Sequence, residues 1–291
     1  EDGGATFRFI VGRYGSGKSF LLQTIRSYAM DRGFVVIDAD LSPERRFIGT
    51  QKQGLATYRE LMKNLSTKTK PDGGALALIL EKWIYGIQAE VMVSNNITAS
   101  DSNLSKLVEI KIFETVSQLK ELVHGFDFAK VLSVYWNAYR DGNEEMKSNV
   151  LRWFRGEYQT KTEAKNEIGV NVIITDSDWY DYCKVFASFL VNAGYKGLLL
   201  LIDELENSMG VRCLDLVSDM LNHNKRDFQI ILTSHHPYVI NNVDMVHWQV
   251  VLREGNRIYS KNKDELGLGK SHHEAFKQLI NLDEYMEGSK K

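Results

Sequence analysis

The residues with the clearest chemical pattern form the segment from Gly12 to Ser19, which reads GRYGSGKS. This segment fits the phosphate-loop pattern G-x-x-x-x-G-K-[ST], in which backbone N–H groups wrap a polyphosphate. Glycines permit this because a Cβ would block the close approach of the backbone to the phosphates. Lys18 supplies a positive charge for the outer phosphates, and the Ser19 hydroxyl supplies a ligand for Mg²⁺. The segment therefore predicts a site for ATP with Mg²⁺.

The neighbouring sequence contains the elements that a phosphate loop needs. Thr6 to Val11 reads as a short buried strand, and Lys18 to Met30 has apolar residues at helical spacing. The amino end of that helix would direct its partial positive charge at the same phosphates. We therefore expect the whole loop to contact the nucleotide, namely Gly12, Arg13, Tyr14, Gly15, Ser16, Gly17, Lys18 and Ser19.

A second candidate group follows the apolar run from Leu198 to Ile202, which ends in Asp203 and Glu204. Ligands of open α/β sheets bind beyond the carboxyl ends of the strands. Asp203 is therefore expected to hold Mg²⁺ together with Ser19, and Glu204 to orient or deprotonate an attacking water molecule. A doublet of acids at this point is typical of proteins that hydrolyse ATP, whereas small-molecule kinases often lack it.

A third group follows the apolar run from Phe228 to Leu232, which leads into Thr233, Ser234 and His235. The strand beside the acidic strand commonly carries a polar side chain next to the γ-phosphate. Any of the three could serve, and His235 could contact the phosphate or the attacking water. The alternative is a capping serine and a surface histidine. The candidate catalytic residues are Lys18, Glu204 and His235.

Other polar residues give weaker signals. Asp38 and Asp40 end the second expected strand, where nucleoside kinases can carry a base. Two histidine pairs lack the ligand spacing of a metal site. Three arginines could reach the site of a neighbouring molecule, but solvated surface positions suit them better: Arg45, Arg46 and Arg226.

The order of apolar runs predicts an α/β fold of the phosphate-loop NTPase class, with a mostly parallel sheet flanked by helices. Residues 1–53 and 166–291 would form the core, and residues 54–165 a helical insertion rich in amphipathic patterns. Strand character returns near Val172. A helix at 213–222, a β-hairpin at 248–261 and a last helix at 274–282 complete the expected core.

Composition narrows the classes of function. The net charge of -2 does not favour a dominant nucleic-acid or membrane surface, although local basic clusters could still contact phosphate. Two cysteines are too few for a disulfide framework, and no apolar run reaches the length of about 20 residues that crosses a bilayer. We expect a cytoplasmic protein without a membrane segment. Because a strand is expected already at Thr6, the chain could be a piece of a longer polypeptide.

Residues 1–206 resemble the ATP-binding domain family of BREX phage-exclusion systems. The resemblance rests on FIVGRYGSGKSFLLQTIRSYAMDRGFVVIDADLSPERR, GLATYRELMKNLS, DFAKVLSVYWNAYRDG, LRWFRGEYQTKTEAK and GYKGLLLLIDELEN. It implies a set of nucleotide-binding residues that agrees with the motif analysis: Gly12, Gly15, Gly17, Lys18, Ser19, Asp203 and Glu204.

Residues 207–291 resemble instead the C-terminal part of ABC-type ATPases of the overcoming-lysogenization-defect kind. The resemblance rests on ENSMGVRCLDLVSDML, FQIILTSHHPYVINN, WQVVLREGN and GKSHHEAFKQLINLDEY. It implies that His235 contacts the γ-phosphate. The LSGGQ-like signature with which ABC dimers complete their site is missing before Leu198. The two resemblances meet at the acidic strand, which leaves open a natural mosaic, a fragment or a designed fusion.

Together these signals favour an ATPase that acts as a motor or switch subunit in a bacterial phage-defence or DNA-transaction system. Expected partners are ATP and either further copies of the chain or other subunits; DNA is possible without being indicated by the charge. One alternative is a switch that binds ATP with negligible turnover. Another is a small-molecule kinase that uses Asp38 or Asp40 as its base.

Overall fold

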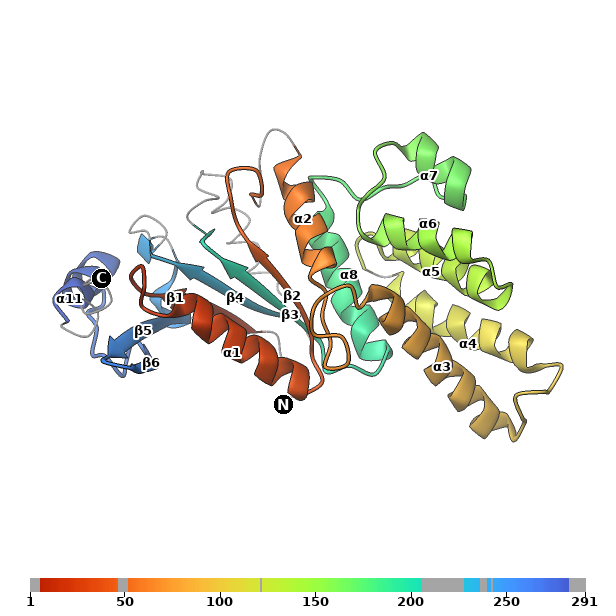
Figure 1. Ribbon diagram of the computed structural model, residues 1–291, viewed down its shortest axis with the longest axis horizontal. Coiled ribbons are helices and arrows are strands. Elements are labelled where there is room, and N and C mark those ends of the chain that lie inside the picture. Colours follow the sequence, from red (N-terminus) through yellow and green to blue (C-terminus); the bar gives the residue numbers. More distant parts are fainter. Residues whose placement is uncertain are drawn as a thin grey trace.

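The computed structural model describes residues 6–46, 52–120, 122–205, 228–235, 240–241 and 243–282. Its centre is a sheet of six strands in the order β2-β3-β4-β1-β5-β6 (Figure 1). All neighbouring strands are parallel except β5 and β6, which form an antiparallel hairpin. The strands are β1 (Thr6–Val11), β2 (Val35–Asp40), β3 (Leu198–Asp203), β4 (Phe228–Ser234), β5 (Trp248–Glu254) and β6 (Arg257–Asn262). The predicted α/β class with a mostly parallel sheet is confirmed.

Strand β4 separates β1, which precedes the phosphate loop, from β3, which carries the acidic pair. The register places Val11 of β1 beside Ser234, and Ile202 of β3 beside Leu232. Because these strands are parallel, their carboxyl ends meet at one edge of the sheet. The three predicted site segments therefore lie at the same edge.

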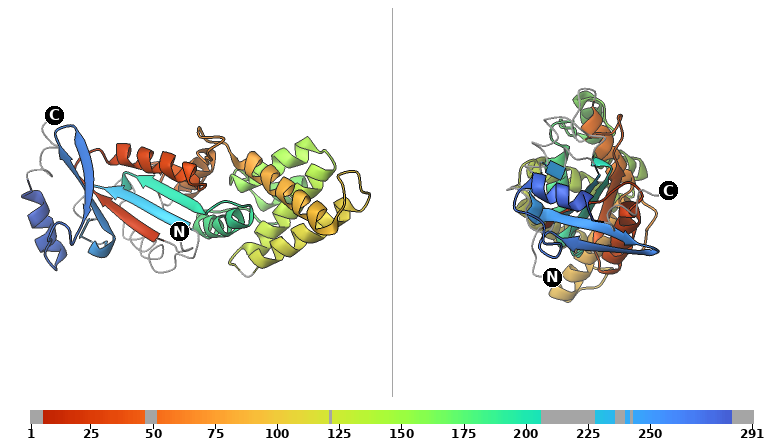
Figure 2. Two further views of the ribbon diagram at one scale, coloured as in Figure 1. Left: turned by 90° about the horizontal axis from the view of Figure 1, so that it is seen from below. Right: turned by 90° about the vertical axis from the view of Figure 1, so that its left-hand side faces the viewer.

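Helices pack on the sheet, and the left-hand view of Figure 2 shows α1 (Lys18–Asp31) along one side of the strands. Helix α1 packs on one face, and α2 (Gln53–Lys63) and α8 (Trp179–Asn192) contribute to the core on the other. The side chains of β3 explain this division because alternate residues of a strand point to opposite faces. Leu199 and Leu201 join the core under α1, whereas Leu200 joins the larger core.

Five further helices gather at one end of the long axis of the molecule (Figure 1). Each packs against the next in sequence, and the buried side chains of Trp83, Tyr135 and Trp153 fill the space between them. They are α3 (Leu76–Asn95), α4 (Leu104–Leu119), α5 (Gly125–Arg140), α6 (Glu144–Phe154) and α7 (Lys161–Ile168). The expected helical character of this part is present, while the domain boundaries at 53 and 165 stay a prediction. In the parts of the chain with described coordinates, no helix is long and apolar enough to cross a membrane.

The expected strand character near Val172 was wrong. Residues 170–175 form no strand, and the Val172 carbonyl accepts a hydrogen bond of 2.7 Å from the indole Nε1 of Trp153. The apolar side chains of this segment are buried by helices instead of by a neighbouring strand. A short apolar run is the same in both cases, so the sequence pattern does not distinguish them. The helix expected at 213–222 lies outside the described residues.

The C-terminal elements agree with the expected hairpin and helix. A short 3₁₀ helix, η2 (Met245–His247), leads into β5, and helix α11 (His272–Ile280) follows the hairpin. Helix α11 begins two residues before the expected start because the Ser271 hydroxyl caps it, accepting a hydrogen bond of 3.2 Å from the backbone N–H of Glu274.

The central position of β3 gives a first prediction. Leu200 is fully buried, so Leu200→Ala leaves a cavity and should lower the free energy of unfolding by about 2–5 kcal/mol. Val93→Ala is the matched control, since Val93 is 83% exposed and should change stability by less than about 0.5 kcal/mol. Urea denaturation of both variants measures the difference; equal losses would contradict the position of Leu200 in the core.

Candidate nucleotide site

The loop between β1 and α1 has the backbone that a phosphate cradle requires. Gly17 precedes the helix with φ of 98°, a left-handed conformation that side chains with a Cβ rarely adopt. A Cβ on Gly17 would lie 2.3 Å from Cδ1 of Ile258, and one on Gly12 would lie 2.6 Å from the Ser16 hydroxyl. Conformation and space both favour glycine at position 17, whereas at position 12 the nearby Ser16 and Val251 side chains favour it through lack of space.

Two polar side chains of the loop fit a phosphate ligand. The Lys18 ammonium group donates hydrogen bonds of 3.0 Å to the carbonyl oxygens of Gly12 and Arg13, so it lies within the curve of the loop. The Ser16 hydroxyl is buried and has no hydrogen-bond partner among the described residues. A buried polar group of this kind is costly unless a ligand or water satisfies it. The loop thus fits an anion with several oxygen acceptors.

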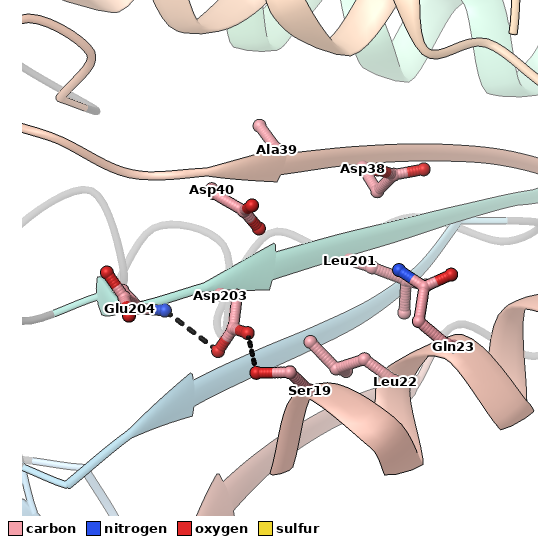
Figure 3. A pocket seen from close by; sticks show the side chains of 9 residues that line it. All are labelled: Ser19, Leu22, Gln23, Asp38, Ala39, Asp40, Leu201, Asp203 and Glu204. Atoms are coloured by element: carbon pink, nitrogen blue, oxygen red, sulfur yellow. Dashed lines mark hydrogen bonds between the residues drawn. The ribbon is translucent and has the colours of Figure 1, made fainter. Parts of the chain in front are cut away.

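Ser19 and Asp203 connect the loop to the acidic strand. The Ser19 hydroxyl donates a hydrogen bond of 2.5 Å to Oδ2 of Asp203, as the close view in Figure 3 shows. Asp203 is 8% exposed and closes β3. A hydroxyl and a carboxylate are oxygen ligands of the type that Mg²⁺ prefers. These two predicted metal ligands are brought together, and their chemistry fits the ion.

Glu204 follows Asp203 in a left-handed conformation, with φ of 55°, which is uncommon for a residue with a side chain. Its backbone N–H donates to Oδ1 of Asp203 at 3.0 Å and to the Thr233 hydroxyl at 3.2 Å. The Thr233 hydroxyl also donates a hydrogen bond to Oδ1 of Asp203. Thr233 of β4 therefore contacts the acidic pair, while the choice among Thr233, Ser234 and His235 for a contact to the γ-phosphate stays a prediction.

His235 lies beside the phosphate loop. It follows Ser234, which is paired with Val11, and its exposed ring contacts the ring of Tyr14 edge-on with centroids 6.3 Å apart. Tyr14 itself is 78% exposed. The structure thus brings His235 to the phosphate loop, and its contact with a γ-phosphate stays a prediction.

A cavity of about 220 Å³ opens beside Ser19 and Asp203. We call it the acidic cavity; it is lined by Ser19, Leu22, Gln23, Asp38, Ala39, Asp40, Leu201, Asp203 and Glu204 (Figure 3). Asp40 is the register partner of Asp203. Burial, followed by repulsion from the carboxylates of Asp203 and Asp38, raises the pKa of Asp40. Asp38 instead forms an ion pair of 3.0 Å with Arg26.

The hairpin of β5 and β6 supports the phosphate loop from outside. Ile258 of β6 lies against Gly17, and Val251 of β5 lies against Gly12. The Arg253 guanidinium donates a hydrogen bond of 3.4 Å to the carbonyl oxygen of Gly15. Sequence reasoning found the hairpin but missed this role, because no local pattern links residues separated by more than 230 positions.

The sequence model of the family described as BREX system ATP-binding protein BrxC/D matches residues 1–220. The chain belongs to this family. The expected BREX resemblance is confirmed and extends beyond residue 206, where the sequence motifs ended. The match includes the phosphate loop and the acidic strand, so the two segments joined by the Ser19–Asp203 contact both lie within the BREX family region.

Other comparisons add less. No protein with a curated description matches the chain. Among solved structures, an inward-facing ABC transporter of metal-chelate type matches with a TM-score of 0.29 and 11% sequence identity. The match covers 95% of this chain and 79% of the transporter chain. At this level of likeness the match carries no argument about this chain.

Some weaker candidates have other contacts or cannot be placed. Arg226 lies outside the described residues, and Arg45 forms an ion pair of 3.6 Å with Glu60, so the role of either arginine at a neighbouring molecule stays a prediction. His272 contacts the carbonyl oxygen of Val243 at 2.9 Å. Over the described ranges, no group of three or more metal-ligating side chains meets the geometry of a separate metal centre.

The contacts of Thr233 predict a cost for losing its hydroxyl. Thr233→Val keeps the shape of the side chain but leaves the partly buried Glu204 N–H and the buried Asp203 carboxylate with one partner fewer. The free energy of unfolding should fall by about 1–3 kcal/mol. Thr233→Ser retains the hydroxyl and serves as the control, with a smaller loss in the same denaturation experiment. A smaller loss in Thr233→Val than in Thr233→Ser would show that the methyl group, not the hydroxyl, matters.

The hairpin contacts predict an effect on nucleotide affinity in this BREX family member. Arg253→Ala and Ile258→Ala should each raise the Kd for ATP about threefold to tenfold. This is the change expected when a contact that stabilises the loop by about 1 kcal/mol is removed. Arg257→Ala is the matched control, because Arg257 belongs to the same hairpin and is exposed. Calorimetric titration with ATP measures the three values. Unchanged affinity in both test variants would exclude a supporting role for the hairpin.

Proposed function

We propose that the chain is a Mg²⁺-dependent ATPase whose turnover drives a conformational step in a BREX phage-defence system. The observation that supports it best is the contact between Ser19 and Asp203, two residues 184 positions apart that meet beside a glycine-rich anion cradle. A loop that only bound phosphate would not need a buried carboxylate at this place. We further propose a cytoplasmic location and assembly with copies of the chain or other subunits.

In this proposal each side chain has a separate task. The backbone of residues 12–19 and the Lys18 ammonium group would hold the phosphates, and Ser19 with Asp203 would hold Mg²⁺. The metal ion would neutralise charge that develops on the phosphates. Glu204 would orient or deprotonate the attacking water, which the rigid peptide between Asp203 and Glu204 favours. His235 is the candidate contact to the outermost phosphate.

A second candidate function is transfer of the phosphoryl group to an acceptor molecule. Asp40 favours it, because this carboxylate lines the acidic cavity together with Ser19 and Asp203 and has a raised pKa. A carboxylate with a raised pKa suits proton removal from an acceptor hydroxyl. The cavity of about 220 Å³ leaves room for a small acceptor only.

Two substitutions test the ATPase proposal. Lys18→Ala should weaken ATP binding by more than about tenfold, because the phosphates lose their charged partner. Glu204→Gln should keep the Kd within about threefold but lower phosphate release about 100-fold, the usual effect of removing a general base. Glu254→Gln is the control, since Glu254 ends β5 at the same edge of the sheet and is exposed.

The fate of the γ-phosphate separates the candidates. ATP labelled at that position should yield inorganic phosphate in the wild type and in Asp40→Asn. Label on an acceptor, absent in Asp40→Asn, would favour phosphoryl transfer. Tight ATP binding with release at background level would identify a nucleotide-dependent switch and contradict the ATPase proposal.

A further inference from the structure

A second and larger cavity is lined by residues from the start of β1 and the end of α1. In Figure 1 these ends lie away from the phosphate loop, at the opposite edge of the sheet. We call this second cavity the basic cavity; its volume is about 760 Å³. A six-residue strand places it about 17 Å from the phosphate loop at about 3.3 Å per residue. Nothing in the ATP site uses its side chains, and its size is within the range of ligand pockets.

The floor of the basic cavity is apolar and rigid. Leu199 of β3 and Ile231 of β4 supply side chains from the sheet, and Ile25 and Ala29 supply side chains from α1. These residues belong to the smaller of the two hydrophobic cores. The floor can therefore contact the flat apolar part of a ligand without rearranging.

Three cations surround this floor: Arg8, Arg32 and Lys196. No carboxylate is present among the described residues that line the cavity. Their backbone positions are fixed, since Arg8 lies within β1 and the N–H of Lys196 donates a hydrogen bond of 3.0 Å to the Gly33 carbonyl. In a chain with a net charge of -2, this is a local excess of positive charge. Such an arrangement attracts anionic groups.

Two tyrosines complete the lining, and a cation lies over a ring face of each. The Arg32 guanidinium lies 4.7 Å from the ring centroid of Tyr28, and the Lys82 ammonium group lies 4.1 Å from that of Tyr195. These contacts restrain the rings, while Tyr28 remains 59% exposed. The cavity thus offers restrained aromatic rings beside positive charge.

We propose that the basic cavity binds nucleotide units of a single-stranded nucleic acid. Bases would stack on Tyr28 or Tyr195, and phosphates would lie against Arg8 and Lys196, which is how single strands are bound without sequence preference. An acidic peptide would pair with the cations but has no use for two restrained rings. A free nucleoside monophosphate has the same chemistry as one unit of the strand, and the experiment separates the two sources.

The first test measures binding of a fluorescent 20-nucleotide oligo-dT to the full chain by anisotropy. Replacing Arg8, Arg32 and Lys196 together by Ala should weaken binding at least tenfold. The slope of log K against log salt should become less steep by about 1.4, since Arg8 and Lys196 each neutralise one phosphate and each such phosphate accounts for about 0.7. The charge-matched control replaces Lys106, Lys161 and Lys165, which are exposed on α4 and α7. An equal loss in both triple variants would overturn the proposal.

The second test addresses stacking and does not depend on the stability of the triple variant. An abasic oligomer of the same length and charge should bind the wild type at least tenfold more weakly than oligo-dT. Tyr28→Leu and Tyr195→Leu should reduce this preference. Equal affinity for both oligomers, or displacement of oligo-dT by polyglutamate of equal charge, would overturn the proposal.

Competition by dTMP in the Lys18→Ala background distinguishes the two sources, since the phosphate loop is then impaired. Displacement of oligo-dT by micromolar dTMP identifies a mononucleotide site with the proposed chemistry. Displacement only at millimolar dTMP identifies the strand as the ligand, because one unit then supplies a fraction of the contacts. Absence of any binding by either probe would contradict the proposal while leaving the ATPase assignment unaffected.

Discussion

The hydrogen bond between Ser19 and Asp203 requires the start of α1 and the end of β3 to lie side by side, and the rest of the architecture makes this possible. Ser19 lies in the first turn of α1 and Asp203 ends β3, yet β4 separates β3 from the strand that leads into α1. The contact is possible because the carboxyl ends of parallel strands share one edge and α1 crosses the face of the sheet toward β3. The apolar side chains of β3, buried on both faces, fix the position of Asp203 and so the geometry of the site.

Two local constraints refine that geometry. Glu204 holds a left-handed backbone that costs of order 1–3 kcal/mol, and such strain persists only where the surroundings determine it. The determining contacts come from Thr233 and from the carboxylate of Asp203, both buried. On the other side of the site, Ile258 packs against Gly17 of the phosphate loop. Contacts from β4 and from the hairpin thus support the two ends of the site.

Sequence reasoning predicted those parts of the structure that local patterns determine. The bounds of β1 and β3 agree with expectation, because a short apolar run that ends at glycine or acidic residues predicts a buried strand with clear limits. The segment near Val172 failed because burial by helices and burial in a sheet select the same apolar residues. In the site, the sequence correctly predicted that Ser19 and Asp203 lie together. The contacts of Thr233 and Arg253 depend on strand register and hairpin packing, which no short motif encodes. The catalytic roles of Glu204 and His235 stay predictions.

The helices from α2 to α8 lie between β2 and β3 in the chain, and the path through them runs from one edge of the sheet to the other. The chain leaves β2 at Asp40, which lines the acidic cavity, and then enters α2 and the helices that follow. It returns through α8, whose end lines the basic cavity with Val191, and reaches β3 by way of Lys196. Helix α1 also joins the cavities, from Ser19 to Arg32. Helix α2 packs on β2 and also against α8. Contiguous packing therefore joins the acidic cavity to the basic cavity along two paths, one through α1 and one from β2 through α2 to α8.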